Sequence, residues 1–485
     1  MNVTDLPSRK GARIYCIGIK GTGMSALAEL LQHAGFQVSG SDQGEVFYTD
    51  AILHALGIPY FESFDPLQVP EDAELVIYSA AYSPQTNPEL AEVQRRGFPL
   101  LKYTDALGAY SAGFDASGIA GVHGKTTTTA MTGVLIRGAG LPAQILAGSA
   151  VTAFGGRSTL TLGNTYFVAE TCEYRRHFLA FHPRRIVLTS VEPDHQDYYP
   201  SYESIRDAFL EYGRKLPPSG QLIYCADDPG ATEVAKILEQ EAGGREKRFI
   251  PYGFTASGPF RIQSYHVAHE QAQMVLSGFP DPLVLRIPGR HSALNAVGAL
   301  ALTDALVKTE EPRGWQQEQW EGARRGLAAF SGSKRRSEIL GERGGILFMD
   351  DYGHHPTAVR STLAGLKDFY PQRRLVVSFM SHTYTRTASL LDEFARCFEQ
   401  AAITVLHKIY PSAREAAASF GINGETLFAR VKAHQDAVYY VSEPLDAVGL
   451  LRSILRPGDL FITMGAGDNW KLGQALFTGA LEVSP

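Results

Sequence analysis

The sequence is poor in cysteine and lacks the patterns on which cysteine chemistry depends. Its 485 residues include four cysteines, which lie far apart and form no C-x-x-C pair. Neither a disulfide framework nor a cysteine-based zinc site is therefore expected. We expect reduced thiols at all four positions, Cys16, Cys172, Cys225 and Cys397.

Long apolar runs, an excess of basic residues and internal repeats are absent too. No apolar stretch approaches the length that spans a bilayer, and residues 1–10 lack the apolar centre of a signal peptide. The net charge of −6 argues against nucleic acid or an anionic membrane as a partner. We therefore expect a cytoplasmic protein with no nucleic-acid partner and no membrane partner, whose anion sites are local clusters.

The remaining composition predicts several ordered domains. With 44% hydrophobic residues over this length, about three domains are expected. Strand and helix patterns alternate, which indicates the α/β class with Rossmann-like domains at both ends and a phosphate-loop domain between them. We predict domains at residues 1–114, 115–330 and 331–485.

Residues 117–129 have the composition of a phosphate-binding loop. Closely spaced glycines turn backbone N–H groups toward one point, Lys125 adds a charge for the phosphates, and Thr126 offers a hydroxyl for Mg²⁺. The helix expected from Thr126 to about Arg137 begins with four β-branched threonines, a locally unfavourable choice that indicates function. Ile119 stands where the standard pattern has its first glycine, so a variant loop is predicted, and an ordinary turn remains the alternative.

The first βαβ unit predicts a second phosphate-binding turn. A strand at 14–17 leads into the glycines of 18–23, a helix follows to His33, and Asp42 lies about 20 positions on. Lys20 replaces the middle glycine of the dinucleotide pattern, which disfavours NAD and favours the diphosphate of another nucleotide, met partly by the Lys20 charge. A purely structural turn stays open. The strand at 76–81 would end at the same crevice.

Polar clusters follow further strands. Glu170 and Glu173 follow one strand and Glu192 to His195 follow another, so both strand ends offer Mg²⁺ ligands or water-ordering groups. In the last third, strands at 346–349, 375–379 and 460–464 lead into residues 350–357, 381–387 and 465–468. By the rule that ligands gather at carboxyl ends of parallel strands, these three clusters should line one crevice.

Other segments are expected to be architectural or to join domains. The alternation in residues 260–287 predicts antiparallel hairpins, and residues 288–295 open a helix. Residues 104–117 are small, polar and glycine-rich, which suits a linker. The basic residues 334–336 lie at a predicted domain junction, where they could reach a triphosphate.

These motifs together resemble the Mur ligases of bacterial cell-wall synthesis, over nearly the whole chain. The resemblance implies that the three domains bind a UDP-sugar, ATP and an amino acid, and it is strongest to members that add L-alanine to UDP-N-acetylmuramate. The motifs that carry it are residues 18–24, 39–42, 121–129, 170 with 173, 192–195, 289–295, 350–357, 382–387 and 465–467.

The resemblance implies a function and a site for each domain. The expected activity is ATP-dependent amide formation through an acyl phosphate in peptidoglycan precursor synthesis, with Mg²⁺ held by Thr126, Glu170 and His195. The residues expected in catalysis are Lys125, His195, Glu170, Arg386 and, as a base for the amine, His354. For ATP they are Gly121, His123, Gly124, Lys125, Thr126, Thr127, His291, Asn295, Arg336 and Asp350. For the UDP-sugar they are Gly18, Lys20, Gly21, Thr22, Gly23, Asp42, Ser79 and Ala80. For the amino acid and substrate they are Tyr352, His354, His382 and Arg386, and the Arg386 guanidinium is expected to meet a substrate carboxylate or phosphate.

The sequence departs from the family pattern at five positions and leaves alternatives open. The departures are Lys20, Ser190, Ser292, Ala358 and Thr383. The last two fall in the expected substrate pocket, so glycine, L-serine or a recycled muropeptide remain alternatives to L-alanine. An NAD-dependent dehydrogenase would leave the loop at 121–129 unused, and a nucleotide switch would leave the acidic and histidine clusters unused.

Overall fold

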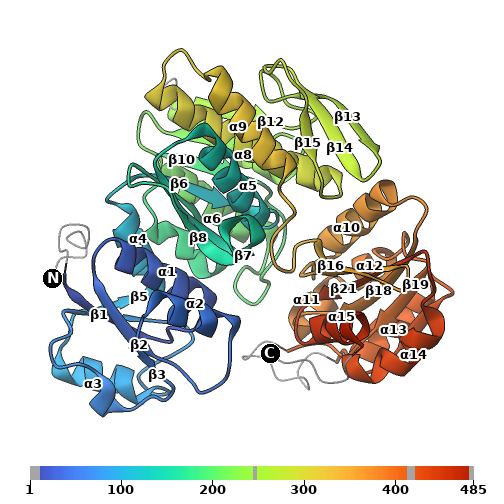
Figure 1. The fold of residues 1–485 in the computed structure, drawn as a ribbon, viewed down its shortest axis with the longest axis horizontal. Coiled ribbons are helices and arrows are strands. Elements are labelled where there is room, and N and C mark those ends of the chain that lie inside the picture. The colour runs from blue at the N-terminus through green and yellow to red at the C-terminus, as the bar shows by residue number, and fades with distance from the viewer. Residues whose placement is uncertain (1–10, 244–247, 412–420, 480–485) are drawn as a thin grey trace.

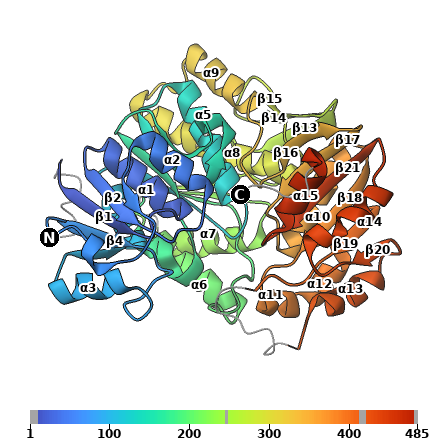
Figure 2. The same cartoon turned by 60° about the horizontal axis from the view of Figure 1, so that its bottom comes forward.

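The structure, a computed structural model, describes residues 11–243, 248–411 and 421–479. The expectation about a signal peptide concerns residues 1–10 and lies outside the described residues. Three α/β units follow one another along the chain, and the first (blue) and last (orange to red) lie on opposite sides of the middle unit in two views (Figure 1 and Figure 2). The α/β class and the three-unit architecture predicted from the sequence are confirmed.

The N-terminal unit is a doubly wound domain around a five-stranded parallel sheet. Its strand order is β3-β2-β1-β4-β5, so the loops after β1, β2 and β4 meet at one edge. The apolar residues of β1 and β4 are buried, because helices cover both faces of such a sheet. Its elements are β1 Arg13–Ile17, α1 Thr22–His33, β2 Gln37–Ser41, α2 Tyr48–Leu56, β3 Tyr60–Phe61, β4 Leu75–Tyr78, α3 Pro88–Arg96 and β5 Leu100–Lys102.

The segment predicted as a linker at 104–117 is instead ordered, and that prediction was wrong. Residues Tyr103–Ser111 form helix α4, and Asp115–Ala120 form strand β6. In α4 the small residues Ala106 and Ala109 let the helix pack closely, and Leu107 and Tyr110 are buried with them. Small residues here serve close packing and not flexibility.

The middle unit holds a seven-stranded sheet and a separate three-stranded sheet. The seven strands have the order β12-β11-β10-β6-β9-β7-β8, with β8 antiparallel. The smaller sheet β13-β14-β15 is antiparallel, as the alternation at 260–287 predicts. The remaining elements are α5 Lys125–Ala139, β7 Ala143–Val151, β8 Arg157–Thr161, β9 Tyr166–Glu170, β10 Arg185–Leu188, α6 Tyr202–Arg214, β11 Gln221–Cys225, α7 Pro229–Ala242, β12 Arg248–Tyr252, β13 Ile262–Ala268, β14 Gln271–Leu276, β15 Leu283–Leu285, α8 Arg290–Glu310 and α9 Gln317–Ala328.

The C-terminal unit is a six-stranded sheet with the order β16-β17-β21-β18-β19-β20. The strands β17, β21 and β18 are adjacent and parallel, so the three polar clusters that follow them meet at one edge as predicted. Its elements are β16 Glu338–Arg343, β17 Ile346–Asp351, α10 Pro356–Phe369, β18 Arg374–Met380, α11 Tyr384–Ser389, α12 Leu391–Arg396, β19 Ile403–Leu406, α13 Gly424–Lys432, β20 Val438–Tyr440, α14 Val448–Ile454, β21 Asp459–Gly465 and α15 Asn469–Thr478.

Apolar packing is continuous between neighbouring units. One buried cluster includes Leu300 of α8 and Leu363 of α10, and another includes Leu27 of α1 and Phe167 of β9. Helix α10 comes so close to the middle unit that a Cβ on Gly365 would lie 2.5 Å from the Gly289 Cα. The predicted boundaries after residues 114 and 330 stay predictions. Within the described residues, no helix is both long and apolar enough to cross a membrane.

Candidate active site

The loop between β6 and α5 has the backbone that its glycines predict. Gly121 and Gly124 have φ values of +133° and +80°, a region that disfavours other residues. A Cβ on Gly121 would collide with Thr189, and one on Gly124 would collide with Asn295. The loop is therefore tightly enclosed, and α5 begins directly at Lys125 with its N–H groups directed toward the loop.

Lys125 is held in a charged state at the start of α5. Its Nζ donates to Glu173 Oε2 at 2.9 Å and also to the Gly121 carbonyl oxygen. Burial alone would lower the pKa of Lys125, but the neighbouring Glu173 carboxylate outweighs it and the net shift is upward. The same pair lowers the pKa of Glu173 against the effect of burial. Both groups therefore carry their charges at neutral pH.

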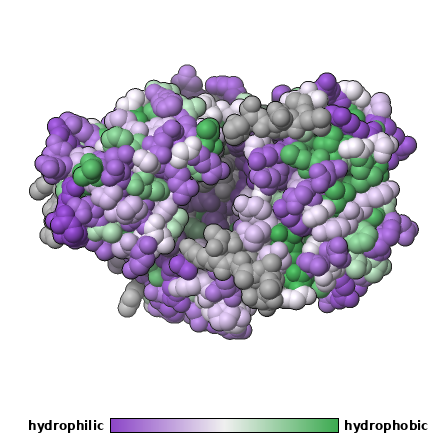
Figure 3. All heavy atoms as spheres, turned by 90° about the horizontal axis from the view of Figure 1, so that it is seen from below, coloured by the Kyte–Doolittle hydropathy of each residue, from purple (hydrophilic) through white to green (hydrophobic). Residues whose placement is uncertain are grey.

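A cavity of about 400 Å³ lies between the loop and the C-terminal unit. Seen from below, the surface is hollowed near its middle (Figure 3). Both the middle and the C-terminal units contribute to the lining, so most of the predicted ATP residues, but not Gly121 or Asp350, face one space with the base candidate. The predicted residues that line it are His123, Gly124, Lys125, Thr126, Thr127, Glu170, His291, Asn295, Arg336 and His354.

The predicted Mg²⁺ ligands are only partly brought together. Thr126 and Glu170 line the same cavity, and their hydroxyl and carboxylate oxygens are the donors that a hard cation prefers. Glu170 Oε2 accepts from the Gly148 N–H at 2.8 Å. His195 is not part of the lining: its ring packs on Tyr174 at 4.7 Å and its Nε2 lies 3.5 Å from Glu173 Oε1. The oxygen donors thus fit Mg²⁺. His195 does not reach the cavity and contacts Glu173 instead.

Asp350 was predicted to bind ATP, but it does not line the cavity. Its carboxylate is buried, where Arg335 donates at 2.9 Å and Thr463 at 2.6 Å. The neighbouring Asp351 lines the cavity instead. Successive side chains of a strand point to opposite faces, and the sequence did not fix which of the two acids takes which side.

The predicted amino-acid residues form one cluster at the carboxyl edge of the C-terminal sheet. The rings of Tyr352 and His354 lie 4.8 Å apart, and those of His354 and His382 lie 5.3 Å apart. His354 Nδ1 lies 2.7 Å from the Tyr352 carbonyl oxygen, which can only accept, so Nδ1 carries the hydrogen and Nε2 the lone pair. Burial, reinforced by Arg386 and His382, holds the pKa of His354 well below its usual value.

Arg386 is committed to a protein carboxylate in this structure. Its Nε and Nη2 donate to Asp194 Oδ1 at 3.0 and 2.6 Å, and its Nη1 donates to the His382 carbonyl oxygen. The prediction that this guanidinium faces a substrate anion therefore does not match its placement. Asp194, a residue of the predicted acidic cluster, is its partner from the middle unit.

The UDP-sugar residues surround the carboxyl ends of β1, β2 and β4, but two of them have protein partners. Lys20 is buried, with its Nζ 2.9 Å from Glu62 Oε1 and 3.1 Å from Asp50 Oδ1. Its charge would reach a diphosphate only if these ion pairs opened. Asp42 Oδ2 accepts from the Lys20 N–H at 2.7 Å and so stabilises the turn.

The other members of this set lie along the turn itself and at the end of β4. Gly18 has a φ of +84° and donates its N–H to the Ser41 carbonyl oxygen. A Cβ on Gly23 would meet the Tyr103 ring, and Thr22 accepts a hydrogen bond from the Tyr48 hydroxyl at 3.0 Å. Gly21, Ser79 and Ala80 are at least partly exposed along the same edge, so a ligand can reach this part of the turn.

Two of the departures from the family pattern support the loops around the cavity. The Ser190 hydroxyl accepts from the His123 N–H at 2.9 Å, which fixes the phosphate loop. The Thr383 hydroxyl accepts from the Arg386 N–H at 3.3 Å and caps α11. Ala358 lines the cavity, and Ser292 donates to the Pro288 carbonyl oxygen.

Sequence reasoning missed the positions of Asp351, His355 and Thr357 in the lining. All three lie within the polar stretch 350–357 that the strand-end argument singled out. The sequence therefore indicates which stretch lies at the site, but not which of its side chains face the cavity. The orientation of side chains in a loop follows from tertiary packing.

Family models match three segments of the chain. Residues 13–115 match the Mur ligase family catalytic domain, residues 119–303 the Mur ligase middle domain, and residues 335–467 the Mur ligase glutamate ligase domain. A UDP-N-acetylmuramate–L-alanine ligase of Treponema pallidum is 51% identical over 96% of both chains. One of Borreliella afzelii is 36% identical over 96% of this chain and 98% of its own.

Solved structures share the fold. A UDP-N-acetylmuramate–alanine ligase of Thermotoga maritima superimposes with a TM-score of 0.75 at 23% identity, over 96% of this chain and 98% of its own. A murein peptide ligase of Psychrobacter arcticus gives a TM-score of 0.66 at 22% identity, over 98% of this chain and 100% of its own. At these identities the likeness concerns the fold alone.

Proposed function

The chain belongs to the Mur ligase family, and from this we propose that it is an ATP-dependent ligase that adds L-alanine to the carboxylate of UDP-N-acetylmuramate. Relatives with this activity in their names are as much as 51% identical to it over nearly its full length. The observation that carries the proposal is that the phosphate loop and His354 line one cavity. A nucleotide switch would have no use for this histidine.

The first step proposed is phosphoryl transfer to a carboxylate. A carboxylate is a poor acyl donor, so an oxygen of the lactyl carboxylate attacks the γ-phosphorus of ATP, ADP leaves and an acyl phosphate forms. Lys125 and the loop N–H groups offset charge on the phosphate oxygens in the transition state. The Glu173 contact keeps the Lys125 ammonium charged and close to the loop until nucleotide arrives.

We propose that Thr126 and Glu170 hold Mg²⁺ when nucleotide is bound, since their oxygens line the cavity together. An ion bound there would neutralise part of the charge on the phosphate oxygens. His195, which was expected as a third ligand, contacts Glu173 instead, and would act on this site only through Glu173 and its partner Lys125.

The second step proposed is acyl transfer to the amine of L-alanine. The amine nitrogen attacks the acyl carbon, the C–O bond to phosphate breaks, and inorganic phosphate leaves. The amine must lose a proton. His354 lines the cavity and has an unprotonated Nε2, because its low pKa keeps the ring neutral and its Nδ1 carries the hydrogen. Tyr352 and His382 pack beside this ring, which supports their assignment to the amino-acid pocket.

We assign the UDP-sugar to the edge of the N-terminal sheet at the turn 18–23, where the strand order reverses beside β1. A cytoplasmic location is proposed with this, since the substrates ATP and a UDP-sugar are metabolites of that compartment.

The proposal is tested by phosphate release with each substrate omitted in turn. Release should require ATP, UDP-N-acetylmuramate and L-alanine together, with glycine, L-serine and a short muropeptide supporting less. Release that needs no UDP-N-acetylmuramate would reject a ligase of this class. Faster turnover with the muropeptide would instead identify the recycling ligase.

A further inference from the structure

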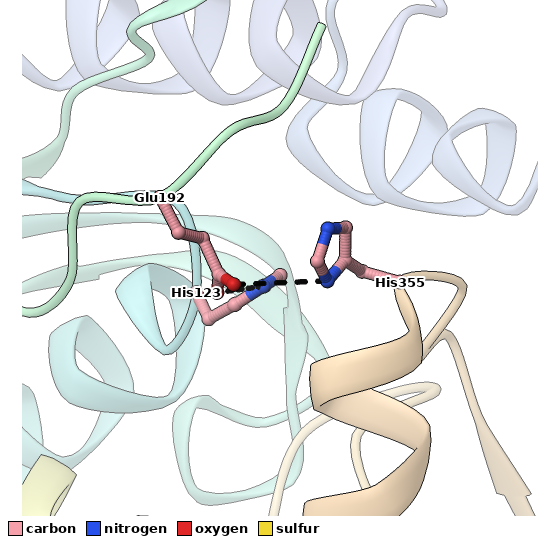
Figure 4. A group of neighbouring side chains, drawn as sticks. All are labelled: His123, Glu192 and His355. Carbon is pink, nitrogen blue, oxygen red and sulfur yellow. Dashed lines mark ion pairs between the residues drawn. The ribbon is translucent and has the colours of Figure 1, made fainter. Parts of the chain in front are cut away.

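Three side chains from separate elements meet at the junction of the middle and C-terminal units (Figure 4). His123 lies in the phosphate loop and Glu192 in the segment after β10, and His355 is the residue that caps the N-terminus of α10. His123 Nε2 lies 2.7 Å from Glu192 Oε1, and His355 Nδ1 lies 4.0 Å from Glu192 Oε2. One ligand atom from each lies within 4.8 Å of the other two. None of the assigned roles above uses this arrangement.

Each of the two imidazoles has one buried nitrogen without a hydrogen-bond partner among the residues that the structure describes. His123 Nε2 is buried and has no hydrogen-bond partner, because its N–H direction does not point along the short line to the Glu192 oxygen. The His355 nitrogen near Glu192 is Nδ1, which accepts a long hydrogen bond of 3.3 Å from the Thr357 N–H, while Nε2 is buried without a partner among the described residues, in a side chain that is only 4% exposed. Buried polar atoms are nearly always paired, so unpaired ones indicate a missing water or ion. In a metal site the nitrogen lone pair points to the ion and not to the adjacent ligand oxygen.

The geometry points to a binding site for a divalent transition-metal ion such as Zn²⁺ or Co²⁺, with His123, Glu192 and His355 as its protein ligands. Two imidazoles and one carboxylate suit Zn²⁺ and its neighbours in the periodic table, whereas Mg²⁺ prefers oxygen donors alone. Three protein ligands leave at least one coordination position for water or a phosphate oxygen from the adjoining cavity.

The ionisation of the ligands suits this role. Burial and the nearby His123 lower the pKa of His355 to about 4, so its ring is neutral at pH 7. An ion at Nδ1 would replace the long hydrogen bond that this nitrogen accepts from the Thr357 N–H. Burial would raise the pKa of Glu192, but its contact with His123 outweighs this and the carboxylate stays charged. Thr357 donates to Glu192 Oε2 at 3.0 Å and orients it, as outer partners of metal ligands do.

An ion at this place would join two units of the protein. His123 lies two residues before Lys125, while His355 begins the helix that packs on the middle unit. Binding would therefore hold the C-terminal unit against the phosphate loop. The site shares no ligand with the Mg²⁺ position proposed at Thr126 and Glu170, although both sets line one cavity, and its existence does not depend on the proposed ligase activity.

The test is titration of the full-length, metal-free protein with Co²⁺, followed through its visible absorption in the presence of excess Mg²⁺. In His355→Asn the amide oxygen can still accept from the Thr357 N–H and cap α10, so the variant should fold, but a strong ligand is lost. Glu192→Gln keeps an acceptor for Thr357 and loses the negative ligand. The matched control is His434→Asn, at an exposed histidine after α13, and Glu170→Gln reports on the Mg²⁺ position.

Wild type, His434→Asn and Glu170→Gln should bind one equivalent of Co²⁺ and show its ligand-field absorption. His355→Asn and Glu192→Gln should bind at least about 10-fold more weakly, as even indirect changes at metal sites have such effects. Zn²⁺ should raise the melting temperature of wild type but not of these two variants. No stoichiometric binding by wild type, or binding that is lost in Glu170→Gln and kept in His355→Asn, would overturn the assignment.

Discussion

Arg386 of the C-terminal unit and Asp194 of the middle unit form a buried ion pair, although 192 positions separate them in the sequence. The two side chains are 5% and 6% exposed, and two guanidinium nitrogens donate to the same carboxylate oxygen. Burial would raise the pKa of Asp194, but Arg386 reverses the effect and the net shift is strongly downward. The pair therefore joins two units of the protein directly beside the proposed acyl-transfer site.

Removing one partner of this pair should cost more than removing both. Arg386→Ala leaves a buried carboxylate without its cation, and Asp194→Ala leaves a buried guanidinium, each at about 3–5 kcal/mol. The double variant should cost less than either single variant, which denaturant unfolding of all four proteins measures. Arg430→Ala, which breaks the exposed pair with Asp392, serves as control and should stay within about 1 kcal/mol. Additive single effects would contradict a direct interaction.

Lys125→Ala should nearly abolish turnover. Loss of a preorganised positive group at the transferring phosphoryl costs roughly 100- to 1000-fold in kcat. The phosphate-release assay with saturating ATP, UDP-N-acetylmuramate and L-alanine measures the change. Lys471→Ala, at a partly exposed lysine of α15, should keep wild-type turnover. Near-normal rates in Lys125→Ala would remove the phosphate loop from the mechanism.

Gly124→Ala should prevent nucleotide binding. The residue has a φ of +80°, and its new methyl group would collide with the Asn295 side chain in the cavity wall. Gly140→Ala is a matched control: Gly140 has a φ of +70°, but no atom of the described residues lies within 4 Å of the place that its new methyl group would take. Gly140→Ala should cost about 1 kcal/mol of stability and leave ATP affinity unchanged. Calorimetric titration with a non-hydrolysable ATP analogue distinguishes the two, and equal affinities would refute the enclosed loop.

Stability should fall as the pH drops from about 6.5 to about 4. Burial lowers the pKa of His407 from 6.5 to about 4 in the folded protein, so the unfolded chain binds a proton that the folded chain does not. Across this window, the free energy of unfolding falls by up to about 3 kcal/mol because of this group. The loss is complete once the pH lies below both pKa values. In His407→Asn the pH slope of the unfolding free energy should be smaller, while the exposed His434→Asn should keep the wild-type slope. Equal slopes in all three proteins would contradict the assignment.

The sequence predicts the sheets and the loops of the site better than it predicts individual contacts. The cluster at 350–357 was placed correctly at a strand end. Asp351 lines the cavity in place of the predicted Asp350, because the face that each side chain takes depends on strand register. The Arg386–Asp194 pair depends on how two units are oriented, which local patterns do not encode. The α4 segment was missed because small residues suit both a flexible linker and a closely packed helix.

Transfer of oxygen from substrate to phosphate tests the central claim, that the protein activates a carboxylate with ATP and joins it to L-alanine. UDP-N-acetylmuramate labelled with ¹⁸O in its lactyl carboxylate is converted with ATP and L-alanine, and both products are analysed by mass spectrometry. The account predicts one labelled oxygen in the released phosphate and one in the new amide of the L-alanyl product. Unlabelled phosphate, or phosphate released without that product, would contradict it.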